Sequence, residues 1–418
     1  MDICALRRDL HQHPEVGFTE FRTATIVVEQ LLSLGYDVRF GRDVMEPSSR
    51  RGLPSESELD HALSRAIADG ASEAIASQMA GGFTGVVATR RGTAPGPTVA
   101  FRFDMDALPI LESQDTSHLP QAEGFRSAYD GNMHACGHDG HTAIGLALAK
   151  QLSEQPFQGT LKLIFQPAEE GGRGARSMVD QGELDDVDRL FCFHLGLDLP
   201  LGWMSGGATE FLASTKLSAH FQGVSAHAAA APEKGKNALL GAATALLNIH
   251  ALPRYSTDAT RVNVGVLEGG TAANIIPDSA RMVLECRAST YEVNLDLERR
   301  VRDILTHSAA MHGLSCDIEV IGEAATATCD KDLIHLAMDQ AKATEWFTHV
   351  VDSHPMRASE DATLMMRRVQ ERGGQATYMV LGTSIAAPHH NPAFDIDETI
   401  LPVAVCFLGR LAMHTLLS

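Results

Sequence analysis

The residues with the clearest chemical potential lie in segment 133–141, where Cys136 and His138 are separated by a single glycine. A thiolate and an imidazole at this spacing can bind one metal ion from a tight turn. A loop that is merely rich in histidine is the alternative. Four other segments also offer metal-binding side chains, namely Glu169 and Glu170, His194, His389 and His390, and Asp104 and Asp106. Together the five segments predict a metal centre.

A pair of metal ions accounts for this number of donors. A dinuclear hydrolytic site needs oxygen, nitrogen or thiolate ligands around two divalent ions roughly 3.5–4 Å apart, with a general base beside the attacking water. Neighbouring glutamates in an irregular turn can point in different directions, so Glu170 can bind metal while Glu169 serves as the base. The other expected ligands are Cys136, His138, His194 and one of His389 and His390.

These donors follow short apolar runs that predict buried strands at 83–89, 98–103, 161–165, 189–193 and 375–381. Helices are expected between them, at 140–152, 175–181, 332–343 and 360–370, and a last helix at 398–416. Strands alternating with helices predict an α/β fold with a mostly parallel sheet and flanking helices. Ligand sites of such sheets lie beyond the carboxyl ends of the strands, where the candidate donors fall.

The pattern changes near residue 211. Polar and apolar residues alternate from 215 to 221, and the order strand, helix, two strands, helix, strand then continues to about residue 320, as in a ferredoxin-like α+β domain. We therefore predict an inserted domain at 211–325, and a main domain formed by 1–210 and 326–418. Segment 45–79 is expected to be a surface insertion.

Length and composition restrict the function. A chain of 418 residues exceeds one ordinary hydrophobic core, which agrees with two domains. The net charge of −19 argues against a nucleic-acid partner. Seven scattered cysteines indicate a reducing compartment, and the charged start with no apolar run does not predict a signal peptide. With no apolar stretch expected to cross a bilayer, the protein is predicted to be cytoplasmic.

Four motifs together resemble the amidohydrolase branch of the aminoacylase and carboxypeptidase-G metallopeptidase family. They are the segments 102–108, 133–141, 165–171 and 390–392, and the similarity extends through nearly the whole chain. It is strongest to the members that hydrolyse p-aminobenzoyl-glutamate or indole-acetyl-amino-acid conjugates. The motifs are specific for the family and much less specific for the substrate.

The resemblance implies two divalent ions, with manganese ahead of zinc, and a set of five protein ligands. His390 is preferred to His389 because the family's ligand precedes an aromatic segment at this spacing. The implied ligands are Cys136, His138, Glu170, His194 and His390, with Glu169 as the general base. Seven other histidines are expected to be structural or surface residues, namely His11, His13, His134, His141, His220, His250 and His312.

The resemblance also implies that the inserted domain is a lid that forms the interface of a homodimer, the alternative partner being a related second subunit. Asp106 matches an acid that orients a metal ligand, and His227 matches a lid histidine that stabilises the oxyanion. Asn274 and Arg287 match positions that bind the substrate's carboxylate. The alternative for Arg287 is that it only pairs with Glu285.

The expected reaction is hydrolysis of a carbon–nitrogen bond in a small aromatic carboxylate, most simply the amide of an aroyl- or arylacetyl-amino acid. Two departures from the family pattern keep an alternative open. Ala273 stands where relatives tend to have Arg, and Ala229 stands where they have Gly. Loss of the Arg favours a substrate with one carboxylate, so hydrolytic deamination of an aromatic amine, such as a nitro-substituted aminobenzoate, is the second hypothesis. A non-catalytic binding protein is the third, disfavoured because a pure binder needs no base at Glu169.

Overall fold

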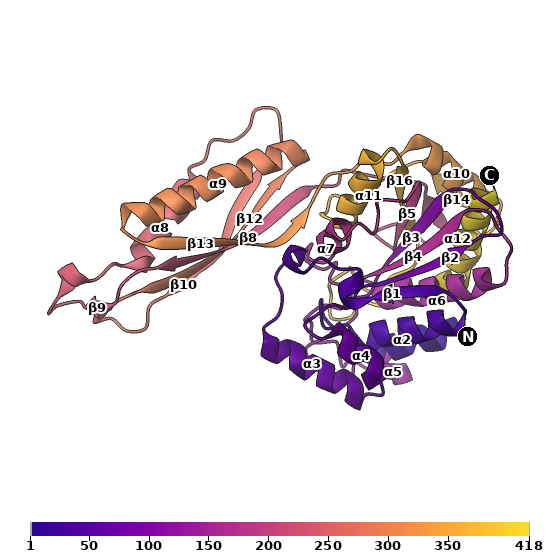
Figure 1. Cartoon of the computed structure of the whole chain (residues 1–418), viewed down its shortest axis with the longest axis horizontal. Coiled ribbons are helices and arrows are strands. Elements are labelled where there is room, and N and C mark those ends of the chain that lie inside the picture. The colour runs from indigo at the N-terminus through magenta and orange to yellow at the C-terminus, as the bar shows by residue number, and fades with distance from the viewer. Residues whose placement is uncertain (1, 418) are drawn as a thin grey trace. The chain divides into compact units, whose positions relative to one another are not determined.

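The computed structural model describes residues 2–417, and the chain forms two compact units (Figure 1). The large unit contains Met1–Thr209, Ala327–Met356 and Asp361–Ser418. The small unit contains Glu210–Thr326 and Arg357–Glu360. Each has its own hydrophobic core.

An eight-stranded sheet forms the centre of the large unit, in the order β1-β2-β4-β3-β5-β16-β6-β14. Neighbours from β4 to β16 are parallel. β1 pairs with β2, β2 with β4, and β6 with β16 in antiparallel fashion, whereas the edge strand β14 is parallel to β6. The strands are β1 (Asp37–Phe40), β2 (Val86–Arg91), β3 (Thr98–Asp104), β4 (Thr160–Gln166), β5 (Arg189–Leu195), β6 (Trp203–Ser205), β14 (His349–Val351) and β16 (Gln375–Leu381). The predicted mostly parallel α/β fold is confirmed.

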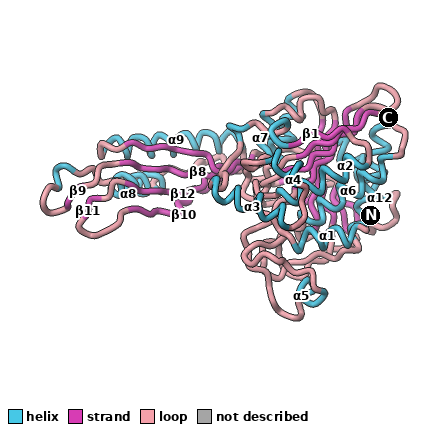
Figure 2. Tube along the Cα trace, turned by 60° about the horizontal axis from the view of Figure 1, so that its bottom comes forward, coloured by secondary structure: helices cyan, strands magenta, loops and turns pink. Residues whose placement is uncertain are grey.

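Helices cover both faces of this sheet (Figures 1 and 2). The helices α2, α6 and α12 pack on strands of the sheet, and α11 packs on β5 and β16, with α7 packed on α11. The helices of the large unit are α1 (Ile3–Gln12), α2 (Phe21–Ser33), α3 (Glu56–Ala68), α4 (Glu73–Ala76), α5 (Leu119–Glu123), α6 (His138–Ser153), α7 (Ala175–Asp180), α10 (Lys331–Lys342), α11 (Ala362–Glu371) and α12 (Ile400–Leu417). Short 3-10 helices span Gly41–Asp43, Pro47–Ser49 and Ser77–Met79, and β7 (Ala208–Thr209) pairs with β15 (His354–Pro355).

The parallel strands bring distant segments to one edge of the sheet. β3, β4, β5 and β16 run in the same direction, so the residues that follow them emerge on the same side. The segments concerned carry Asp104 and Asp106, Glu169 and Glu170, His194, and the loop towards His390. This topology positions the candidate site.

Helix α12 is, among residues 2–417, the helix long and apolar enough to cross a membrane by length and composition, with a mean hydropathy of 1.8. It packs on α6 and β3 within the hydrophobic core, and 56% of the helix is buried. The sequence predicts this helix at 398–416, with no stretch that crosses a bilayer. A mostly buried core helix passes the same test.

The small unit is a four-stranded antiparallel sheet in the order β10-β12-β8-β13, with α8 and α9 packed on one face. Its strands are β8 (Ala213–Gln222), β10 (Arg261–Gly269), β12 (Ser279–Ala288) and β13 (Ser315–Ala324), and its helices are α8 (Ala238–His250) and α9 (Tyr291–Met311). The chain order strand, helix, two strands, helix, strand is the ferredoxin-like arrangement. A two-stranded antiparallel sheet of β9 (Ala226–His227) and β11 (Ile275–Ile276) and a 3-10 helix (Pro232–Lys234) complete the unit.

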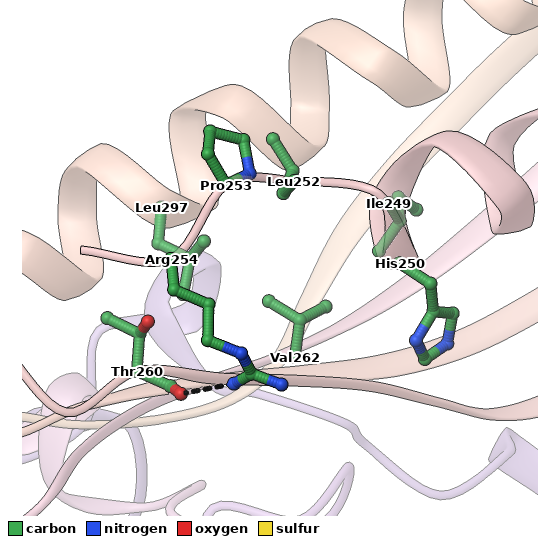
Figure 3. Close-up of a pocket in the computed structure, with 8 residues that line it drawn as sticks. All are labelled: Ile249, His250, Leu252, Pro253, Arg254, Thr260, Val262 and Leu297. Carbon is green, nitrogen blue, oxygen red and sulfur yellow. Dashed lines mark hydrogen bonds between the residues drawn. The ribbon is translucent and has the colours of Figure 1, made fainter. Parts of the chain in front are cut away.

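A small pocket of this unit lies between the end of α8, the following loop and α9 (Figure 3). Arg254 lines it and donates a hydrogen bond to the carbonyl oxygen of Thr260 (3.3 Å). Because that bond engages the guanidinium in local structure, we assign the pocket no role.

Candidate metal centre

The turn before α6 presents Cys136 and His138 to the same point. Gly137 between them has φ +91°, a left-handed conformation that side chains other than glycine disfavour. His138 Nδ1 lies 2.8 Å from the carbonyl oxygen of Asp106 and therefore carries the proton. Its other nitrogen, Nε2, is buried and makes no hydrogen bond to any residue from 2 to 417. A buried lone pair without a donor is what a metal ligand requires.

His194 is prepared in the same way at the end of β5. Its Nδ1 donates to the carbonyl oxygen of Leu195 (2.7 Å), which leaves the lone pair of Nε2 directed at Cys136 Sγ, 3.4 Å away. Burial, with His141 and His389 nearby, holds the pKa of His194 well below its usual value. The imidazole is neutral, as a metal ligand must be.

Two groups of three donors share Cys136. In each group the ligand atoms lie within 4.8 Å of one another; one is Cys136, His138 and His194, and the other is Cys136, Glu170 and His390. Hydrogen bonds to Cys136 and Glu170 raise the pKa of His390 to about 10, which shows that these two acceptors attract positive charge. Burial and the nearby carboxylate of Glu170 raise the pKa of the Cys136 thiol. A cation bound between Cys136 and Glu170 would counter this rise, because it favours the thiolate. The donor set fits two divalent ions.

A tight turn after β4 carries Glu169 and Glu170, and buried carboxylates hold it. Asp106 Oδ1 accepts from the backbone N–H of Glu169 (2.9 Å), and Asp106 Oδ2 accepts from that of Glu170 (3.0 Å). Glu20 Oε1 accepts from the backbone N–H of Ala168 (2.8 Å). Ala168 has φ +52°, an uncommon conformation for a residue with a side chain. Asp106 thus orients both the turn of Glu169 and Glu170 and the ring of His138.

The two C-terminal histidines have different surroundings. His390 Nε2 lies 3.3 Å from Glu170 Oε1, within the second donor group. His389 Nε2 lies 3.2 Å from the carbonyl oxygen of Leu195, and His389 belongs to no donor group among residues 2–417. The geometry favours His390 over His389, as the resemblance implied.

The sequence did not predict a set of buried, mutually paired charged side chains next to the donors. Arg102 contacts Asp104 Oδ2 (2.5 Å) and Asp361 Oδ1 (3.4 Å), and Asp104 Oδ1 lies 2.5 Å from His141 Nδ1. Asp361 directly precedes α11, and its carboxylate accepts from the backbone N–H groups of Gly174 and Ala175 at the start of α7. Only the distance between these segments in the sequence hid the pairing.

The three residues predicted in the small unit do not lie together. His227 and Asn274 lie together at the two-stranded β9–β11 sheet, where the N–H of Ala228 donates to the carbonyl oxygen of Asn274 (3.0 Å). Arg287 lies near the opposite end of β12, directly across from Ser214, and pairs with Glu285 (2.9 Å). Its side chain remains 39% exposed, so the ion pair leaves part of the guanidinium accessible.

The α/β fold and the shared donor groups define a hydrolase built around a dinuclear metal centre. A family model, "Peptidase family M20/M25/M40", matches residues 100–414. The chain belongs to this family, which confirms the recognised resemblance.

Two curated relatives cover almost the whole chain. An indole-3-acetyl-aspartic acid hydrolase from Enterobacter agglomerans is 47% identical over 98% of this chain and 94% of its own length. One of the p-aminobenzoyl-glutamate hydrolase subunits of Escherichia coli is 46% identical, with the same coverage of 98% and 94%.

Solved structures share the fold. The aminobenzoyl-glutamate utilization protein from Klebsiella pneumoniae superposes with a TM-score of 0.86 at 41% identity, covering 99% of this chain and 95% of that one. A dinuclear metal binding peptidase of family M20 from Bacillus subtilis superposes with a TM-score of 0.66 at 25% identity, covering 99% and 97%.

Proposed function

We propose that the protein hydrolyses the amide bond of a small aroyl- or arylacetyl-amino acid in a metal-dependent reaction. The observation that carries the proposal is the pair of donor groups sharing Cys136. Glu169 is in neither of these two groups, but one of its carboxylate oxygens lies within 4.8 Å of possible ligand atoms of His138 and Glu170. The names of the two curated relatives describe reactions of this class. All seven cysteines are free thiols, which supports a reducing compartment, the cytoplasm.

In this proposal the metal ligands are Cys136, His138, Glu170, His194 and His390. Bound divalent ions would lower the pKa of a water molecule and polarise the scissile carbonyl. We propose manganese as the working metal, following the resemblance, although a thiolate ligand by itself suits zinc. Activity after reconstitution with each metal distinguishes them.

Glu169 is the proposed general base. It takes a proton from the attacking water and returns it to the leaving amide nitrogen, so the proton balance closes within one residue. The clamp of Asp106 on the turn supports this role, because a base must be held within hydrogen-bond distance of the water.

His227 is proposed to donate a hydrogen bond to the oxyanion. Its Nδ1 accepts from the backbone N–H groups of Ala229 (3.2 Å) and Ala230 (3.1 Å). A nitrogen that accepts two N–H groups carries no proton, so Nε2 carries it and is a ready donor. The side chain is exposed, as a group that meets a substrate must be.

The separation of the predicted carboxylate-binding residues supports a dimeric enzyme. Ser279 follows Asn274 closely in the chain, and from Ser279 to Arg287 is eight residues of β12, about 26 Å at 3.3 Å per residue. One small aromatic conjugate cannot span this distance within a single small unit. We therefore propose that one substrate meets Arg287 of one protomer and His227 and Asn274 of the other.

The exposed surface of the small unit suits a second copy of this chain. β10 is an edge strand whose Val266 and Leu267 are each 38% exposed. On α8, which packs beside β10, Leu240 and Leu247 lie seven residues apart on one helix face and are 53% and 69% exposed. An unpaired strand edge next to an apolar stripe favours association.

Sedimentation of the purified chain tests the interface. We expect a dimer for the wild type and a monomer for Leu247→Glu, whereas Met311→Glu, equally exposed on α9, stays dimeric. A wild type that is monomeric and inactive alone would point to a related second subunit instead, and a monomer with full activity would contradict the proposal.

The reaction is tested on chelated protein reconstituted with manganese or zinc and supplied with p-aminobenzoyl-glutamate and indole-3-acetyl-aspartate. Release of free amino acid is measured. Glu169→Gln should lower kcat by about 10²–10⁴-fold with metal content unchanged. Glu170→Gln should lower both kcat and the metal content. Unchanged activity of Glu169→Gln would refute the mechanism.

Deamination of an aromatic amine is the second candidate, favoured by Ala273 where relatives tend to have Arg. Loss of that cation suits a substrate with a single carboxylate. On aminobenzoates, release of ammonia without free amino acid would decide for it.

A further inference from the structure

The N-terminal helix α1 buries charged side chains against the large unit. Arg7 and His11 are one helical turn apart and both are fully buried. Neither belongs to a candidate donor group among residues 2–417. Buried charges are costly unless they are paired, so their partners indicate what they do.

Arg7 connects two segments that carry candidate metal ligands. Its Nε lies 2.8 Å from Asp139 Oδ2, and Asp139 directly follows His138. Its Nη2 donates to Asp395 Oδ1 (2.6 Å), on the loop that follows His390. One planar guanidinium therefore contacts two carboxylates, each from a segment that carries a candidate ligand.

His11 completes the contact with the first segment. Its Nδ1 lies 2.8 Å from Asp139 Oδ2, and its Nε2 lies 2.9 Å from Glu112 Oε1. Asp139 Oδ1 also accepts from the backbone N–H of Gly140 (2.8 Å), which ties the carboxylate to the first turn of α6. These contacts connect α1 to the turn that bears Cys136 and His138, so the position of the turn depends on that of α1.

The loop of His390 needs an anchor. His390 has φ +64°, a conformation that surrounding structure must impose on a non-glycine residue. Its own N–H donates to the carbonyl oxygen of Ala135 (2.8 Å), which joins the two segments at one point. The loop is also held by the N–H of Ser113, which donates to the carbonyl oxygen of Pro392 (2.8 Å). Arg7 adds a charged point of attachment that joins the loop to the start of α6.

We infer that Arg7 is a positioning residue that sets the distance between the turn of Cys136 and His138 and the loop of His390. The inference rests on the proposed function, because it assumes that these residues bind the same pair of ions. Its consequence is that α1, far from the donors in sequence, controls metal retention.

The test measures Mn²⁺ affinity of the chelated full-length chain by calorimetry, with metal content by mass spectrometry and the unfolding temperature of the metal-free protein. For Arg7→Met we expect Mn²⁺ to bind about 10–100-fold more weakly, the range for partners that orient metal ligands. Activity at saturating Mn²⁺ should recover in large part. Asp395→Asn, which cuts only the contact to the loop, should weaken binding in the same direction.

Arg8→Met is the matched control. Arg8 is the neighbouring residue of α1 and pairs with Glu398 (2.6 Å) and Glu123 (2.7 Å), but it contacts neither Asp139 nor Asp395 among the contacts of residues 2–417. The Arg8→Met variant should have a lower unfolding temperature but an unchanged Mn²⁺ affinity. Wild-type affinity in Arg7→Met would overturn the inference, since a merely structural residue lowers the unfolding temperature alone.

If Arg7→Met does not fold, the Mn²⁺ affinities of Arg7→Lys and Asp395→Asn decide whether the inference holds. The lysine keeps the charge but cannot bridge both carboxylates, so unchanged affinity in these two variants would equally overturn the inference. A wild type that binds no metal would refute the proposed function, and the inference with it.

Discussion

Asp106 offers the sharpest test of how the turn of Glu169 and Glu170 is held. Asp106 is 1% exposed and accepts both backbone N–H groups of the turn. In Asp106→Asn one oxygen remains as an acceptor, while the new amide N–H₂ faces the second backbone N–H. One charge-assisted hydrogen bond is lost and one N–H is left without an acceptor.

The magnitude follows from these two hydrogen bonds. A hydrogen bond to a charged group contributes about 1.5–3 kcal/mol, so the variant should lose roughly 2–3 kcal/mol of unfolding free energy. Typical stabilities are about 5–15 kcal/mol, and the protein should remain folded. The displaced base should lower kcat by about 10–100-fold.

Glu15→Gln is the matched control for this variant. Glu15 is also a buried carboxylate with two backbone N–H donors, from Arg22 (2.9 Å) and Thr23 (2.8 Å), but these begin α2. Urea unfolding and steady-state kinetics should show similar stability losses, with kcat reduced only in Asp106→Asn. Equal kcat losses in both variants, or none in either, would refute the reasoning.

Three further outcomes are expected. Burial and Arg7 oppose protonation of His11, but its bonds to Asp139 and Glu112 outweigh them and raise its pKa to about 9. This stabilisation, roughly 3 kcal/mol at most, is complete below about pH 6.5 and is lost as the pH rises to about 9. The urea midpoint of His11→Gln should therefore fall less over that range than the wild type's, and parallel pH profiles would contradict this. Gly145→Ala would place a Cβ 2.8 Å from the Phe103 and Phe165 rings, costing about 1–3 kcal/mol; an unchanged unfolding temperature would show that the rings can move. Chelation should lower the unfolding temperature, and two equivalents of Mn²⁺ should restore it; no change would argue against tight binding to the folded state.

The sequence by itself predicted the elements that carry the candidate site. β3, β4, β5 and β16 were expected as short buried runs, and the structure has strands within a few residues of each. Apolar periodicity is local, and donors placed after apolar runs are visible without knowing how the strands pair. The direction of β2, antiparallel to β4, was not visible, because pairing depends on partners far along the chain.

Tertiary structure alone decided how the donors are surrounded. It distinguished His390, beside Glu170, from His389, which meets the carbonyl oxygen of Leu195. It also brought Arg7 to Asp395, although most of the chain separates them. Local sequence encodes the residue types and the periodicity of strands and helices. Which buried charge meets which depends on packing between distant segments, where each charge must find a partner to offset the cost of leaving water.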